Sequence, residues 1–334
     1  MTKGVVRAFL VAVTALGVGG LAEGQEGRWS IELGAAYLRA YGHDPHVLTV
    51  HAIDAGPPRS ESKTGVILET EGEVAYLAEF RYTKGPWGLG LDVFWYDTAQ
   101  STPVHTAAAA GPIDEVVFET ADQRFTSTNP SQILLYEILP DTDLIFWTMD
   151  LFGTRRLAGD DESGIHLLAG VRFADFDNDY HAIVGVRDVG GWRVSASSNY
   201  GRMTGPLLGL TGELRRGRST LRGIFNQSVV IGSAELTNKA ARFTGTFTFV
   251  EDEEFVPDEV FHAEQDVAIP ITEFRAEWDY RIWRRLSVSL GVQTAVWWDV
   301  PVPPGVIPAE GGDRSLHENT IVFVGGRGGL KYEF

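Results

Sequence analysis

The chain has 334 residues, no cysteine, and 28 Lys and Arg against 45 Asp and Glu, which gives a formal net charge of −17. This acidity argues against a nucleic-acid binder, because such domains carry basic surfaces. The lack of cysteine excludes a disulfide framework and any site that binds metal through thiolates. Aromatic residues make up 11% of the chain, so an ordered fold is expected rather than disorder.

The first 22 residues have the composition of a secretory signal peptide. Lys3 and Arg7 precede an uncharged apolar segment, residues 8–18, and Gly20 and Ala22 supply the small residues of a cleavage site. We therefore expect an exported protein with a single mature domain over residues 23–334; a buried N-terminal helix is the alternative. Beyond this segment no uncharged apolar stretch approaches the ~18 residues of a spanning helix.

Long segments of the mature chain alternate between apolar and polar residues with a period of two. Phe274 and Trp278, for example, alternate with Arg275 and Glu277. This period is typical of strands with one apolar and one polar face. The segments reach the ~10 residues that cross a bilayer, whereas strands of soluble sandwiches average about five or six. We expect ten strands, near 28–41, 70–82, 87–97, 142–157, 164–176, 192–214, 220–236, 270–283, 286–299 and 319–334. Residues 113–120, 131–139 and 242–250 could add a further hairpin, which would make twelve strands.

The predicted links between these strands alternate in length. Those over 83–86, 158–163, 215–219 and 284–285 are short, whereas those over 42–69, 98–141, 177–190, 249–268 and 300–318 are long and carry most of the excess acid. Short periplasmic turns and long extracellular loops are typical of bacterial outer-membrane barrels. The sequence therefore predicts an all-β, antiparallel up-and-down β-barrel in the outer membrane, in contact with its lipid and lipopolysaccharide. A soluble protein with one solvent-exposed sheet face is the alternative.

The last predicted strand ends in an aromatic residue. Leu330, Tyr332 and Phe334 lie on one face of it. This pattern resembles the C-terminal signal of bacterial outer-membrane proteins, and the resemblance implies that the barrel-insertion machinery is a partner.

A second resemblance covers residues 145–235. It rests on Trp147–Leu151, Leu168–Ala174, Gly205–Leu210 and the strand end Val230–Gly232. These segments resemble the Legionella-type major outer-membrane protein family, whose members are pore-forming barrels. The chain departs from that family at Phe152, where an acidic residue is usual. The resemblance implies a pore but identifies no solute.

Alternation places a set of charged residues of both signs on the face opposite the lipid. They either line a narrow aqueous passage and set its ion preference or fill the lumen as a plug, as happens in barrels of about eight strands. We expect porin-like passive diffusion of ions or small polar solutes; a closed structural or adhesive barrel acting through acidic loops is the alternative. The candidate lumen residues are Glu79, Asp92, Asp150, Arg172, Glu213, Arg222, Glu273, Arg275, Glu277, Asp279 and Arg281.

Other chemistry-bearing residues lie in the predicted loops. His43 and His46 offer metal ligands, and the acidic run 251–254, with Asp258 and Glu259, offers oxygen ligands to divalent cations, but neither has a spaced metal-site pattern. A hydrolase site at the rim would draw on Asp97, Asp299, His317 and Glu318. No Gly-x-Ser-x-Gly motif is present. The sequence thus predicts no metal, no cofactor, no nucleic-acid partner and no enzymatic activity, and it leaves the oligomeric state open.

Overall fold

The computed structural model describes residues 27–41, 46–54, 60–67, 72–101, 105–108, 115–119, 124–127, 135–160, 163–186, 190–244, 259–302 and 317–334. The predicted signal peptide, His43, the acidic run 251–254 and Asp258 lie outside these residues. Within them all regular elements are β-strands. No helix in the described ranges has the length and apolar composition needed to cross a membrane.

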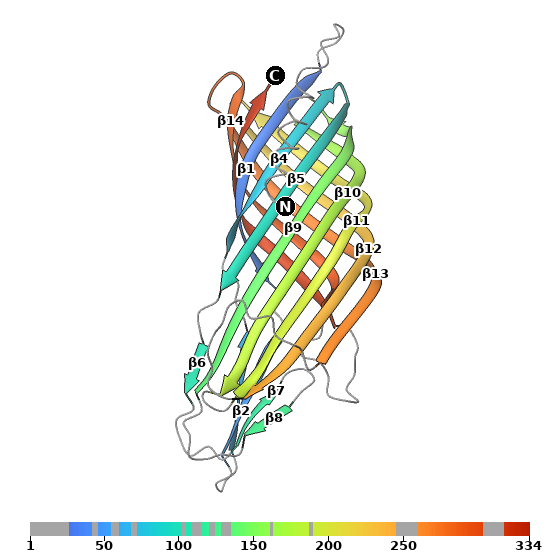
Figure 1. Cartoon of the computed structure of the whole chain (residues 1–334). Helices are drawn as coiled ribbons and strands as arrows, with labels where there is room; N and C mark the ends of the chain where they lie inside the picture. The colour runs from blue at the N-terminus through green and yellow to red at the C-terminus, as the bar shows by residue number, and fades with distance from the viewer. Residues whose placement is uncertain are drawn as a thin grey trace.

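Ten of these strands form one closed antiparallel barrel (Figure 1). Each strand pairs with its neighbours in chain order, β9 pairs with both β5 and β10, and the barrel closes where β1 pairs with β15 from Ser30↔Glu333 to Tyr41↔Val322. The predicted all-β up-and-down barrel is confirmed. The barrel strands are β1 (Arg28–Tyr41), β4 (Glu73–Lys84), β5 (Trp87–Ser101), β9 (Leu135–Gly159), β10 (Ser163–Val186), β11 (Gly190–Arg216), β12 (Ser219–Thr244), β13 (Glu259–Arg281), β14 (Leu286–Val302) and β15 (His317–Glu333).

A second, four-stranded sheet lies beyond one end of the barrel (Figure 1). It has the order β3-β2-β7-β8 and is formed by β2 (His46–Asp54), β3 (Ser60–Ile67), β7 (Glu115–Glu119) and β8 (Arg124–Ser127), while β6 (His105–Ala108) pairs with β9. The twelve-strand alternative is wrong. Residues 115–119 join this second sheet, and 135–139 and 242–244 extend β9 and β12, because they continue the existing pairing with β10 and β11.

The two ends of the barrel differ in their connections. At one end, here called the turn end, Gly85 and Gly217 adopt φ of 59° and 63° in tight turns between β4 and β5 and between β11 and β12. Positive φ is what two-residue hairpin turns require, and glycine adopts it at no steric cost. At the same end Ser163 N donates a hydrogen bond to Asp160 Oδ1 at 2.9 Å between β9 and β10. The opposite end, where the long connections lie, is called the loop end.

The barrel wall is much taller on one side (Figure 1). Strands β9 to β13 have 23 to 27 residues, whereas β1, β4 and β5 have 12 to 15. A tilted strand needs only about 9–11 residues to cross a bilayer. The loop-end parts of β9 to β13, from Asp175, Glu235 and Asp266 outward on their strands, are called the tall wall.

On the long strands, such as β10, β12 and β13, the apolar face changes from the outside to the inside along the barrel. On β10, Val171 and Phe173 are exposed on the outer face and Arg172 is buried. Four residues after Arg172, Phe176 is buried, and Asp175 and Asp177 lie outside. The turn-end half is therefore apolar outside, as in lipid, and the loop-end half is apolar inside, as in a water-soluble protein. The lumen consequently holds a charged layer at the turn end and an apolar layer at the loop end, not the polar lining expected throughout.

Candidate functional site

The charged layer of the lumen contains the residues that the sequence predicts to face inward. Seven of the eleven are almost fully buried, and Glu213, Glu273, Arg275 and Arg281 are half-buried. Four further charged side chains join the layer without having been predicted. Alternation would have found them, since each lies an even number of residues from an inward position on its strand. They are Glu32, Arg81, Arg327 and Lys331.

Glu79 lies at the centre of this layer. Its carboxylate contacts Arg81 at 3.0 Å, Arg275 at 2.9 Å and Arg327 at 2.9 Å. Arg275 also reaches Asp92 at 3.1 Å, and Arg81 pairs with Asp92 as well. Because β4 and β13 are not neighbours in the sheet, the Glu79–Arg275 pair spans the lumen.

A second cluster is centred on Arg172, which is 1% exposed. Its guanidinium donates to Asp150 at 2.7 and 2.6 Å, to Glu273 at 2.6 Å and to Ser228 at 3.2 Å. Two-pronged bonds of this kind to a carboxylate are the strong class of charge-assisted hydrogen bond. Arg172 on β10 thus ties β9 to β13, which are separated by three strands.

A third cluster lies nearest the turn end. Arg222 contacts Glu277 at 3.3 Å and Asp279 at 3.2 Å, and Lys331 contacts Asp279 at 3.4 Å. Arg281, the last of the predicted lumen residues on β13, is half-buried beyond this cluster. The three clusters carry both signs of charge, so buried charges compensate one another across the lumen.

Aromatic side chains cross the lumen in the apolar layer. The ring of Phe146 on β9 lies 4.5 Å from that of Phe323 on β15 and 5.7 Å from that of Trp297 on β14. Phe176 on β10 lies 5.7 Å from Trp297. Phe146, Phe176, Phe323 and Trp297 are each 3% exposed or less. Since β9 and β15 are separated by β1, β4 and β5, these rings meet from opposite parts of the wall.

A small cavity separates the two layers. It has a volume of about 40 Å³ and is bounded by Glu79, Asp92 and Arg275 on one side and by Phe146 and Trp297 on the other. This is room for a few water molecules. Sites for small organic ligands are larger, roughly 300–1,000 Å³.

The outer face of the tall wall is acidic. Exposed or half-exposed Asp and Glu outnumber Arg and Lys there, and His262 lies 3.9 Å from Glu235 and 3.8 Å from Glu264. An acidic field of this kind attracts cationic partners at low salt. Among the tall-wall side chains whose exposure the structure describes, the acidic ones are Asp175, Asp177, Asp179, Glu235, Glu264 and Asp266, and the basic ones are Arg202 and Lys239.

Two of the rim residues considered for a hydrolase, Asp97 and Asp299, lie on strands that are not neighbours. Asp97 on β5 and Asp299 on β14 are both exposed, and β15, β1 and β4 lie between their strands. His317 and Glu318 lie opposite Val302 and Pro301 in the β14–β15 pairing. The C-terminal residues Leu330, Tyr332 and Phe334 lie on the outer face, where they are 54%, 40% and 58% exposed.

Comparisons with known proteins identify the fold but no family. No protein-family model matches the chain, and no curated protein matches its sequence. Among solved structures, the outer membrane protease OmpT from Escherichia coli matches with a TM-score of 0.50 and 13% identity, over 93% of this chain and 99% of that chain. The Pseudomonas putida toluene transporter TodX has a TM-score of 0.25 and 9% identity, over 93% of this chain and 90% of that chain.

Two statements follow from the fold. The closed barrel, with its apolar outer band and its resemblance to outer-membrane proteins, is located in the outer membrane. The expectation that the chain is not an enzyme is corrected, because a solved structure with this fold, matched over 93% of this chain and 99% of that chain, is a protease. At 13% identity that likeness concerns the architecture and transfers no catalytic residue.

Proposed function

We propose that the protein is a closed outer-membrane barrel that holds the tall wall and its adjoining acidic loops at the cell surface. The filled lumen is the observation that carries this proposal. Ion pairs such as Glu79–Arg275 span the charged layer, and Phe146 meets Phe323 and Trp297 across the apolar layer. A solute would have to displace both layers in series.

Porin-like diffusion, which the resemblance to the Legionella-type family implies, is the competing function. It would need the charged layer to open, and each of its central carboxylates contacts at least two cationic groups. The cavity of about 40 Å³ between the layers has room for a few water molecules but gives no continuous path by itself. The packing of the lumen therefore favours the closed barrel.

The surface role is supported by the shape and charge of the loop end. Strands of 23 to 27 residues extend well beyond the ~9–11 needed to cross the bilayer. Their outer face is polar and acidic, as expected for a surface in water that meets cationic partners. A partner would contact this wall without entering the lumen.

Single-channel recording in planar bilayers tests the proposal. Folding of the sample is first checked by its heat-modifiable gel mobility, and a general-diffusion porin serves as the positive control for insertion. We expect no unitary current steps over a wide voltage range. Regular steps with reproducible ion selectivity would contradict the closed barrel and support porin-like passage instead.

A further inference from the structure

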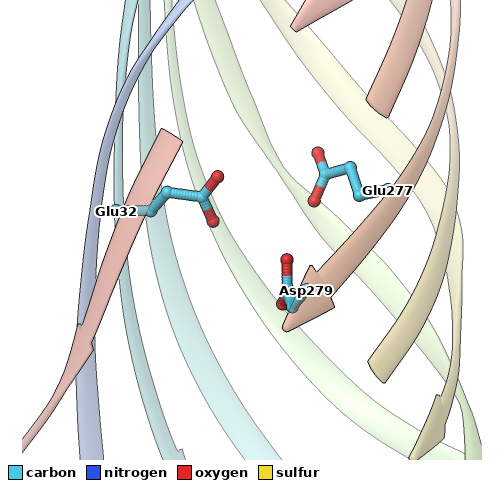
Figure 2. Close-up of side chains that lie close together, drawn as sticks. All are labelled: Glu32, Glu277 and Asp279. Atoms are coloured by element: carbon cyan, nitrogen blue, oxygen red, sulfur yellow. The ribbon is translucent and has the colours of Figure 1, made fainter. Parts of the chain in front are cut away.

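Three buried carboxylates meet in the lumen near the turn end (Figure 2). Glu32 comes from β1, and Glu277 and Asp279 come from β13. One oxygen of each lies within 4.8 Å of the other two, and the side chains are 3%, 1% and 4% exposed. Like charges at such separations repel one another strongly in a water-poor interior.

Each of these side chains also has an oxygen without a hydrogen-bond donor. Glu32 Oε2, Glu277 Oε1 and Asp279 Oδ1 are buried and accept no hydrogen bond. A buried acceptor left without a partner costs free energy, and most such atoms in folded proteins are satisfied. Figure 2 shows the three carboxylates directed toward a common space.

The nearby cations mostly bind the other oxygens. Arg222 contacts Glu277 Oε2 and Asp279 Oδ2, and Lys331 contacts Asp279 Oδ2. Ser289 donates to Glu32 Oε1 at 2.7 Å. Arg327 Nη1 lies 2.8 Å from Glu277 Oε1 but makes no hydrogen bond with it, and its Nη2 is already held by Glu79 at 2.9 Å.

We propose that Glu32, Glu277 and Asp279 bind one Ca²⁺ ion through one carboxylate oxygen each. Carboxylate oxygens are the ligands that hard divalent cations prefer. Ca²⁺–oxygen distances of about 2.3–2.6 Å place oxygens on opposite sides of the ion roughly 4.6–5.2 Å apart, which accommodates separations of up to 4.8 Å. Mg²⁺, with metal–oxygen distances of about 2.0–2.1 Å, would need the three oxygens to lie closer together. Water completes the coordination.

The ion would tie together strands that are not neighbours. Between β1 and β13 lie β14 and β15, and β1 with β15 forms the pairing that closes the barrel. A cation shared by Glu32 and Asp279 links the wall on both sides of this closure and neutralises the mutual repulsion of the carboxylates. The site is independent of whether the lumen conducts.

Calcium dependence of stability, measured on the full-length refolded protein in micelles, tests the site. We expect CaCl₂ to raise the unfolding temperature above its value in EDTA. Glu32→Gln should remove this increase and weaken Ca²⁺ binding about tenfold or more in calorimetry, because one of three charged ligands is lost. In EDTA, Glu32→Gln should be at least as stable as the unsubstituted protein, because one clustered charge is gone.

Glu213→Gln is the matched control, since Glu213 is an inward carboxylate outside the cluster. It should keep the full calcium response. The acidic loops also attract Ca²⁺, so the diagnostic signal is the difference between the unsubstituted protein and Glu32→Gln. Equal calcium responses in these two proteins, or no response in either, would overturn the proposal. If Glu32→Gln does not fold, Asp279→Asn replaces it, with the same loss of the calcium response expected. In EDTA, Asp279→Asn should be less stable than the unsubstituted protein, because Arg222 and Lys331 lose an ion-pair partner.

Discussion

At the scale of single residues, the lumen is stabilised by charges that are individually costly to bury. An ion pair removed from water gains little net free energy, but removal of one partner leaves the other charge buried and uncompensated. Arg172 is the extreme case, because it contacts both Asp150 and Glu273 and is 1% exposed. The buried arginines of the lumen are therefore expected to contribute far more to the free energy of unfolding than arginines near the surface.

Replacement of Arg172 by methionine tests this expectation. Arg172→Met keeps most of the side-chain length but leaves Asp150 and Glu273 without their shared partner, and we expect a loss of about 3–5 kcal/mol in the free energy of unfolding. Urea titration monitored by tryptophan fluorescence measures it. Arg215→Met is the control, since the Arg215–Glu213 pair is about a quarter to a third exposed and should contribute under ~1 kcal/mol. Equal losses of unfolding free energy in the two variants would contradict the assignment of Arg172 to a filled lumen.

At the scale of strands, alternation and link length predicted the number and order of the barrel strands and the facing of their turn-end halves. The features that the sequence did not predict, namely part of β13, Arg327 and the ion-pair partners, have physical explanations. Residues 259–269 of β13 were excluded because the apolar side chains there, such as Ile269, point inward, so the pattern no longer matched a lipid-facing strand. Arg327 lies an even number of residues from the inward Phe323, but the glycines around it show no contrast between apolar and polar residues that would mark this face. The ion-pair partners could not be predicted, because contacts across the lumen depend on strand tilt and stagger.

The glycines of β15 offer a sharp test of strand packing. A Cβ on Gly325 would overlap the carbonyl oxygen of Tyr37 on β1, whereas a Cβ on Gly326 would face outward with its nearest atom 3.9 Å away. We expect Gly325→Ala to lower the free energy of unfolding by about 1–3 kcal/mol through overpacking, and Gly326→Ala to change it by under ~0.5 kcal/mol. Urea titration of the two variants measures both, and equal stabilities would contradict the close β1–β15 approach.

At the scale of the whole molecule, one chain combines two kinds of β-structure. The turn-end half has the apolar exterior of a membrane protein, and the loop-end half has the apolar interior of a soluble one. The net charge of −17 can therefore be carried largely outside the lipid, while the charged layer inside the barrel is compensated by its own ion pairs. This division places the surface available to partners at the tall wall.

The orientation of the whole barrel can be tested because the chain has no cysteine, so that any introduced thiol is the only one. With a membrane-impermeant maleimide, Glu264→Cys on the tall wall should be labelled on intact cells. Lys84→Cys at the turn end should be labelled only after the outer membrane is permeabilised, because short turns face the periplasm. Leu290→Cys, which is on the lipid-facing side of β14, should resist labelling in both cases. Labelling of Lys84→Cys but not Glu264→Cys on intact cells would show the opposite orientation, with the tall wall in the periplasm.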